Sequence, residues 1–288
     1  MTHFINLRAQ SVGGGVAGAP TLWNDGSPVD LGTLAGLVTG RNVLIATHGF
    51  NVSGPDGRSA LSMWETLLTL PGWAYIAVLW PGDSSWLHGL DYPVEGNEAI
   101  ASAKLLAPCL DRYCTGAASL SFVSHSLGAR LVLETVRQTR CTIRQAILMA
   151  GAIDDTCLGG EYQDAAAKLE SISVLASMRD EVLAWAFPPG NLAGGIVTKG
   201  SPYWHGALGR FGPAVPLPTG IDVPPLWQIP DSWAYGHHNY LPQSGFSGVR
   251  LAPPETVPPP DTSIPGTFPG STPCWSAAVV STLLTQRT

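Results

Sequence analysis

The chain has 288 residues, of which 45% are hydrophobic and only 12% are charged, and its formal net charge is −6. This composition excludes a disordered chain, and no Lys/Arg run offers the basic patch that nucleic acid or an anionic membrane requires. No apolar stretch is long enough to span a bilayer, and the first residues lack the features of a signal peptide. We therefore expect a cytoplasmic protein with no nucleic-acid partner and no membrane span.

Short apolar runs alternate with longer segments of helical periodicity, a pattern typical of an α/β fold with a mostly parallel central sheet flanked by helices. This pattern and the lack of a clear linker predict one domain over residues 1–288. Buried strands are predicted at 42–47, 75–80, 120–123, 145–150 and 172–176, with a sixth near Asp222 and Val223. Helices are predicted at 60–68, 98–110, 128–137 and 275–284.

Two stretches are irregular in composition. Residues 188–220 are rich in Gly and Pro and are predicted to form loops or a cap-like insertion. Residues 251–273 carry so many prolines that neither a helix nor a central strand is plausible, so a Pro-rich C-terminal extension on the surface is expected. The five cysteines match no metal motif, and we expect buried reduced thiols, no metal and no cofactor.

The strongest chemical motif is Ser124-His125-Ser126-Leu127-Gly128, between a predicted strand and a predicted helix. This is the context of a nucleophile elbow, G-x-S-x-G, in which a tight turn lifts the Ser hydroxyl above the sheet. Ser124 replaces the first Gly of that pattern but is still small. The motif makes Ser126 the candidate nucleophile and the N–H of Leu127 a candidate oxyanion donor. The elbow geometry is expected to turn the His125 side chain away from Ser126.

A second motif, His48-Gly49-Phe50-Asn51, directly follows the first predicted strand. A loop of this kind supplies the other oxyanion N–H in enzymes with a nucleophile elbow, and here that donor is the N–H of Phe50. Gly49 lets the backbone approach a substrate closely, and Asn51 is expected to brace the loop through its side chain. The alternative is a loop histidine that caps a strand.

A Ser nucleophile needs a base, and the base needs a carboxylate that orients it. In this fold the acid follows the nucleophile in the chain and the His comes last. Asp180 follows the predicted strand 172–176 and is preferred as the acid, while Asp154, Asp155 and Glu181 are competitors. The alternative role for Asp180 is a helix N-cap.

Three histidines follow Asp180, namely His205, His237 and His238. His205 lies in the Gly/Pro-rich stretch and comes too early. The pair in Gly236-His237-His238-Asn239-Tyr240 lies on a late loop, and His237 is preferred because the preceding glycine frees the loop to project its ring. His238 stays open as the alternative base.

With these motifs the chain resembles the α/β-hydrolase superfamily, in particular a bacterial esterase/lipase-like branch formerly of unknown function. The segments that carry the resemblance are 47–52, Leu79-Trp80-Pro81-Gly82-Asp83, 123–128, 176–183 and 236–240. The resemblance implies an ester-cleaving enzyme with Ser126, Asp180 and a late His as its triad. In similar proteins a Gly-His pair carries the base, which supports His237, while the doubled His departs from the pattern.

The expected function is that of a serine carboxylic-ester hydrolase, an esterase or lipase that acts on uncharged small-molecule esters through an acyl-enzyme. His48, Gly49, Asn51, Trp80 and Trp86 are candidate substrate-binding residues. Trp185 is a further candidate for the cleft, although core packing is the more common role of a Trp. The alternatives are an acyltransferase or peptidase on the same scaffold, or a non-catalytic binding protein with a hydrolase fold.

Overall fold

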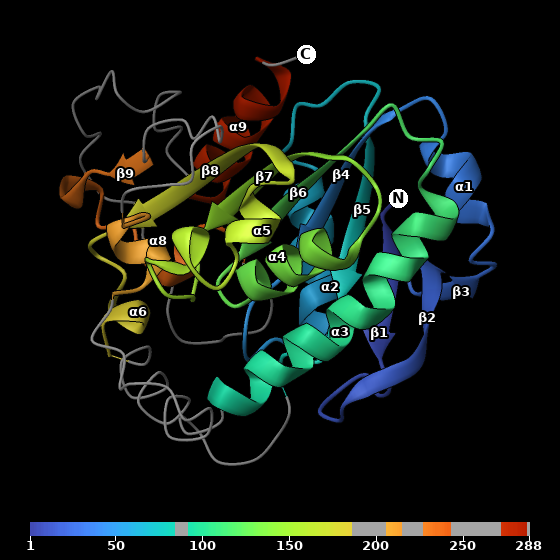
Figure 1. Cartoon of the computed structure of the whole chain (residues 1–288), viewed down its shortest axis with the longest axis horizontal. Helices are drawn as coiled ribbons and strands as arrows, with labels where there is room; N and C mark the ends of the chain where they lie inside the picture. Colours follow the sequence, from blue (N-terminus) through green and yellow to red (C-terminus); the bar gives the residue numbers. More distant parts are fainter. Residues whose placement is uncertain (84–91, 186–205, 215–226, 243–271, 287–288) are drawn as a thin grey trace.

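A computed structural model shows a nine-stranded sheet in the order β3-β2-β1-β5-β4-β6-β7-β8-β9 (Figure 1). The structure describes residues 1–83, 92–185, 206–214, 227–242 and 272–286. Seven neighbouring strands, from β1 to β9 in that order, run parallel, and only the hairpin partners β2 and β3 are antiparallel. The predicted mostly parallel sheet is therefore confirmed.

The parallel part of the sheet contains every buried strand that the sequence predicts within the described residues. Its strands are β1 (His3–Arg8), β4 (Asn42–Thr47), β5 (Ala74–Leu79), β6 (Ser119–His125), β7 (Ile143–Met149), β8 (Leu169–Ser177) and β9 (Trp227–Ile229). The strand expected near Asp222 and Val223 lies outside the described residues. The last strand that the structure describes is the short β9, which pairs with the end of β8.

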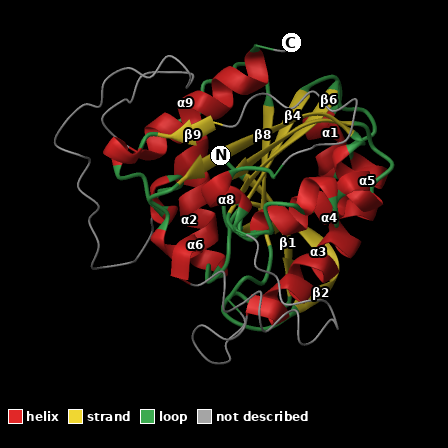
Figure 2. Cartoon of the chain, turned by 60° about the vertical axis from the view of Figure 1, so that its left-hand side comes forward, coloured by secondary structure: helices red, strands yellow, loops and turns green. Residues whose placement is uncertain are grey.

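Helices cover both faces of the sheet (Figure 2). On one face lie α3 (Tyr92–Tyr113), α4 (Gly128–Gln138) and α5 (Gln163–Ala166), and on the other lie α2 (Gly54–Glu65) and α9 (Thr272–Thr285). The remaining described helices are short, namely α1 (Thr33–Val38), α6 (Glu181–Trp185), α8 (Leu208–Phe211) and the 3-10 turns Cys157–Gly159, Asp231–Trp233 and His237–Asn239. The split between two faces follows from right-handed crossovers, because the strand order reverses direction after β5.

Three N-terminal strands are not predicted from the sequence, namely β1, β2 (Val16–Asn24) and β3 (Ser27–Val29). β2 contains Gly, Ala and Pro and lies at intermediate burial along most of its length, so it lacks the continuous apolar run that marks the other strands. β1 bridges the hairpin and the parallel sheet, with an antiparallel partner on one side and parallel β5 on the other.

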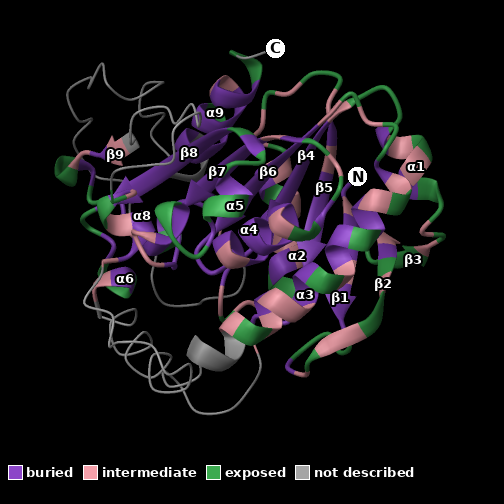
Figure 3. Cartoon of the chain, viewed as in Figure 1, coloured by how far each residue is buried: buried purple, intermediate pink, exposed green. Residues whose placement is uncertain are grey.

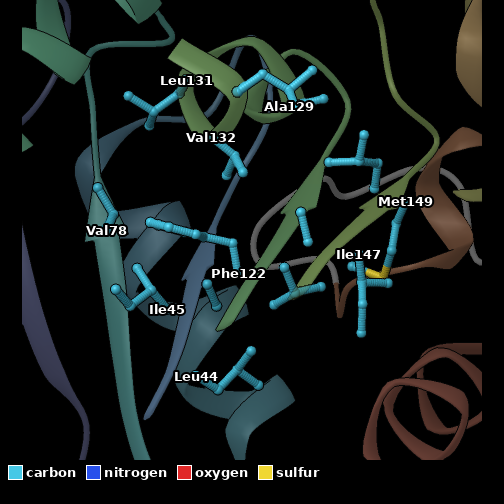
Figure 4. Close-up of a cluster of buried hydrophobic side chains, with 14 of the residues drawn as sticks. Leu44, Ile45, Val78, Phe122, Ala129, Leu131, Val132, Ile147 and Met149 are labelled. Carbon is cyan, nitrogen blue, oxygen red and sulfur yellow. The ribbon is translucent and has the colours of Figure 1, made fainter. Parts of the chain in front are cut away.

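The core lies between the sheet and its helices (Figure 3). The central strands are buried along almost their whole length, as expected for parallel strands covered on both faces. Figure 4 shows part of this core, which includes Phe122 of β6 and Val132 of α4.

The irregular segments are only partly described. Of the cap-like insertion at 188–220, the structure describes residues 206–214, which include α8; the Pro-rich segment 251–273 lies outside the described residues except for the start of α9. Cys109, Cys114, Cys141 and Cys157 are free thiols, and all but Cys141 are buried. No helix within the described ranges has the length and apolarity needed to cross a membrane.

Candidate active site

The candidate site residues lie at one edge of the sheet, because each follows the carboxyl end of a parallel strand. His48 follows β4, Ser126 follows β6, Asp180 follows β8, and His237 follows β9 after a short 3-10 turn. The carboxyl ends of parallel strands meet at a common edge, where open α/β sheets bind their ligands. Residues far apart in the chain are thus brought together by topology alone.

The structure joins Ser126, His237 and Asp180 in one hydrogen-bonded chain. His237 Nε2 lies 2.9 Å from Ser126 Oγ, and His237 Nδ1 lies 2.7 Å from Asp180 Oδ2. All three residues are buried, and Asp180 completely so. With Nδ1–H donating to the carboxylate, Nε2 keeps a lone pair that accepts the serine hydroxyl.

The backbone holds Ser126 in a conformation that is rare for its residue type. Its φ is 55°, in the left-handed region that usually favours glycine. Neighbouring strands and the following helix hold it there, because its N–H donates to Met149 O at 3.0 Å and its carbonyl accepts from the N–H groups of Ala129 and Ala152. This is the strained turn that the elbow motif predicts, and such strain clusters at functional sites.

Two glycines allow the loop after β4 to pack directly against the elbow. A Cβ on Gly49 would lie 2.6 Å from Ser126 Cβ, and a Cβ on Gly128 would lie 2.5 Å from His48 O. Real Cβ atoms do not approach other atoms so closely. Gly128, the fifth residue of the elbow motif, therefore has to be a glycine because its backbone touches the loop that begins at His48.

Asp180 makes the contacts expected for both of the roles considered for it. While Oδ2 faces His237, Oδ1 accepts the N–H of Leu183 at 2.8 Å, so the same carboxylate caps α6. Of the competing acids, Glu181 is exposed and the other two are engaged elsewhere. Asp154 accepts from the N–H and hydroxyl of Thr156, and Asp155 accepts from the N–H of Gly206.

Of the two late histidines, His237 is the one that contacts both Ser126 and Asp180. His238 is exposed, and its ring lies edge-on to that of His237 with centroids 5.6 Å apart. His205 lies outside the described residues. Gly236 precedes the 3-10 turn in an extended conformation with φ −92°, so its role here does not require a left-handed glycine.

Side chains of helix α9 contact the loop that carries His237. Ser276 Oγ donates to Tyr240 O at 2.6 Å and accepts the indole N–H of Trp64 from α2 at 3.0 Å. Trp275 packs edge-on against Tyr235 and Trp233, with ring centroids 5.0 Å and 5.3 Å away. The sequence predicts this helix, but nothing in its composition indicates a contact with the His237 loop.

The backbone N–H groups of Phe50 and Leu127 have no hydrogen-bond acceptor within the part of the chain that the structure describes. Leu127 lies at the start of α4, where the first N–H groups of a helix have no partner within the helix. An N–H in this position favours a negative charge, because the helix dipole has its positive end there.

His48 and Trp80, which were expected to contact substrate, have side chains that are almost completely buried and bind each other. His48 Nδ1–H donates to Gly49 O at 2.9 Å, and Nε2 accepts the N–H of Trp80 at 3.3 Å. The Trp80 indole N–H donates back to His48 O at 2.9 Å, and the two rings stack. Burial lowers the pKa of His48 to about 4, so the ring is neutral and braces the loop.

Asn51 also acts differently from the expectation. Its side chain is exposed and makes no hydrogen bond to the described residues, whereas its backbone N–H donates to Gly82 O. Its φ of 55° is a conformation that asparagine tolerates better than most residues. Trp86 lies outside the described residues, as does the side chain of Trp185.

Arg8 lies at the edge of the candidate site and was not predicted from the sequence to have a role there. Its side chain is 1% exposed, forms an ion pair with Asp83, and donates to Trp80 O at 2.8 Å and Val52 O at 3.3 Å. It therefore ties together the loops after β1, β4 and β5. A lone Arg at the end of an unpredicted strand gave no indication of this role, although Asp83 lies in one of the motifs noted above.

Potential metal ligands do not cluster in this part of the molecule. Among the described residues, no group of three or more His, Cys, Asp or Glu side chains has an arrangement that could hold a metal ion.

Comparison with known families gives one extensive match. The family described as alpha/beta hydrolase of unknown function (DUF900) matches residues 36–241, more than half of the chain. No curated protein has a sequence that matches this chain.

Several solved structures are similar to parts of this chain at low sequence identity. The structure of SOBER1 from Arabidopsis thaliana is 13% identical, covering 54% of this chain and 84% of that chain, with a TM-score of 0.35. A predicted CIB-like hydrolase from Thermoplasma acidophilum is 14% identical, covering 77% and 83%, with a TM-score of 0.38. An inhibited esterase B from Lactobacillus rhamnosis is 10% identical, covering 49% and 58%, with a TM-score of 0.31.

Proposed function

Since the chain belongs to the DUF900 family of α/β hydrolases, we propose that it is a serine carboxylic-ester hydrolase. The observation that carries this proposal is the pair of contacts at His237, 2.9 Å to Ser126 Oγ and 2.7 Å to Asp180 Oδ2. These distances are within the range in which a base can take a proton from a nucleophile and a carboxylate can orient the base.

In the proposed reaction, His237 Nε2 takes the proton of Ser126 as Oγ attacks the ester carbonyl. Asp180 holds the proton on Nδ1 and stabilises the imidazolium that forms. The imidazolium then gives its proton to the leaving alcohol, which leaves an acyl-enzyme. Water, activated by the same imidazole, attacks the acyl-enzyme and releases the acid and free Ser126.

The negative charge that develops on the carbonyl oxygen is proposed to lie against the N–H groups of Phe50 and Leu127. Their lack of an acceptor among the described residues supports this role. Phe50 directly follows Gly49, which packs against the elbow so closely that a Cβ there would lie 2.6 Å from Ser126 Cβ, and Leu127 directly follows Ser126, so both residues are next to this contact. Loss of one such donor typically costs on the order of 10²- to 10³-fold in rate.

An uncharged acyl group fits the surroundings of the site best. Arg8 is a cation close to the loop that begins at His48, but it is buried and its charge is paired with that of Asp83. Met178 and Val182, which flank Asp180 in sequence, and Phe211 of α8 are large apolar side chains left exposed. Exposed apolar side chains in the segment around Asp180 and on α8 favour a hydrocarbon acyl chain over a charged one.

The test is hydrolysis of p-nitrophenyl esters of increasing acyl length by wild type, Ser126→Ala and Ser119→Ala. Ser119 is the matched control, because it begins β6, the strand that ends just before Ser126, and its hydroxyl donates a hydrogen bond to Asn42 Oδ1 away from the site. We expect Ser126→Ala to abolish turnover and labelling by a fluorophosphonate, and Ser119→Ala to retain both. Hydrolysis that survives Ser126→Ala would refute the mechanism, and transfer to an added alcohol in excess of hydrolysis would assign an acyltransferase instead.

A further inference from the structure

His125, directly before the nucleophile, is buried but has no part in the mechanism above. Its Nε2 lies 2.8 Å from the carbonyl oxygen of His237. The His125 and His237 rings are neighbours, with centroids 4.8 Å apart, and the Tyr240 ring lies 5.9 Å from His125. The sequence predicted only that this side chain would turn away from Ser126, whereas the structure shows where it goes.

The partner of His125 fixes its tautomer. A carbonyl oxygen only accepts hydrogen bonds, so His125 Nε2 must carry a proton. Burial lowers the pKa of His125 well below its ordinary value, and the neighbouring His237 acts in the same direction. The ring is therefore neutral, with its proton on Nε2 and a lone pair on Nδ1.

The other nitrogen faces the loop that begins at His48. A Cβ on Gly49 would lie 3.2 Å from His125 Nδ1, so the ring packs against the backbone of that loop. The imidazole of His125 therefore contacts the loop that begins at His48 on one side and the loop that carries His237 on the other.

Among the described residues, side chains that hold the loop carrying His237 include three donors, each on a different carbonyl. Tyr235 Oη donates to Asn239 O at 3.1 Å, and Ser276 Oγ donates to Tyr240 O. Of the three donors, His125 is the one that holds the carbonyl of the base itself. Its loss would remove a side-chain hydrogen bond from that buried carbonyl and loosen the backbone from which the base projects.

We propose that His125 is a positioning residue, whose Nε2–H fixes the backbone of His237 and thereby the distance from the base to Ser126 Oγ. This inference rests on the proposed function of Ser126 and His237. A displacement of about 1 Å in a catalytic group can cost on the order of 10²-fold in rate, so one backbone hydrogen bond is enough to matter.

The experiment compares His125→Gln with His125→Met in the full chain. The two side chains have nearly the same length and volume, but only Gln carries a terminal N–H₂, at a distance from the backbone similar to that of Nε2. We expect kcat for a p-nitrophenyl ester to fall about 10²-fold in the Met variant and about tenfold or less in the Gln variant, with KM changed far less than kcat. His3→Gln is the control, because His3 begins β1 at the edge of the sheet opposite the site, and this variant should match wild type.

Equal kcat for the Gln and Met variants would overturn the inference, as would a loss confined to KM. ¹⁵N NMR of the wild-type imidazoles gives a second test that needs neither folding of a variant nor turnover. We expect the His125 proton on Nε2, and a proton on Nδ1 would overturn the inference. If no ester is turned over, the rate of fluorophosphonate labelling replaces kcat, so that a wrong substrate class is distinguished from a wrong role for His125.

Discussion

Asp180→Asn tests the proposed triad most sharply, because the two oxygens of this buried carboxylate have different partners. Oδ1 accepts the N–H of Leu183 at 2.8 Å, and Oδ2 lies 2.7 Å from His237 Nδ1. An asparagine of the same shape can satisfy Leu183 only with its amide oxygen. Its N–H₂ then faces His237 Nδ1, and the imidazole must present a lone pair there and carry its proton on Nε2.

In that tautomer, His237 Nε2 donates toward Ser126 Oγ and cannot take its proton. A reversed tautomer in a Ser-His-Asp triad costs about 10⁴-fold in kcat, which corresponds to roughly 5 kcal/mol at 1.36 kcal/mol per decade. Both hydrogen bonds of residue 180 are formally retained, so the fold should survive. We expect kcat for a p-nitrophenyl ester to fall by about this factor while the urea midpoint stays close to that of wild type.

Asp154→Asn is the matched control, because Asp154 also follows a central strand and accepts two hydrogen bonds, both from Thr156. It should retain wild-type kcat within a few-fold. The assignment of the acid is refuted if Asp180→Asn keeps more than about a tenth of wild-type kcat, which is far above the loss expected for a reversed tautomer. It is equally refuted if Asp154→Asn shows the large loss instead.

Three further predictions concern the loops around the site. Asp83→Asn removes one partner of the buried ion pair with Arg8 and should lower the free energy of unfolding by about 3 to 5 kcal/mol, measured by urea denaturation. Gly49→Ala should slow fluorophosphonate labelling on the order of 10²-fold, since the new Cβ would lie 2.6 Å from the nucleophile's Cβ, whereas Gly18→Ala meets nothing within 4 Å and should label normally. The pKa of His48 is about 4 in the folded chain and about 6.5 in the unfolded chain. As pH drops between these values, the unfolded chain binds a proton that the folded chain does not, so the free energy of unfolding should fall by about 3 kcal/mol.

Each of these predictions has a clear contrary result. Wild-type stability of Asp83→Asn would show that the ion pair is not needed to hold the loops. Rapid labelling of Gly49→Ala would show that the loop can move away from the elbow. His48→Asn removes the titrating ring, so an unchanged slope of stability against pH in that variant would show that His48 does not cause the acid loss.

The sequence predicted the central strands and the long helices because continuous apolar runs and helical periodicity report burial directly. The site followed from topology, since motifs placed after successive parallel strands meet at one edge. The N-terminal hairpin was missed because β2, at the margin of the sheet, is only partly buried and its sequence does not alternate cleanly.

The roles of individual side chains were harder to predict than their location. His48 and Trp80 were expected to face a substrate, but each satisfies the other's polar groups within the buried loop. No sequence pattern distinguishes a His that lines a cleft from one that braces it, because both follow a strand and precede a glycine. Likewise, Arg8 and His125 are single residues whose partners lie on other loops, and such long-range pairs leave no trace in a local motif.

The side chains that support the proposed site extend beyond the region that matches the family. Residues 36–241 contain every proposed catalytic group, yet Arg8 lies before that region and Ser276 after it. Both side chains hold loops of the site through backbone carbonyls, Arg8 at Trp80 and Ser276 at Tyr240. An expression boundary drawn at the family limits would therefore keep the chemistry and discard two of the side chains that hold it in place.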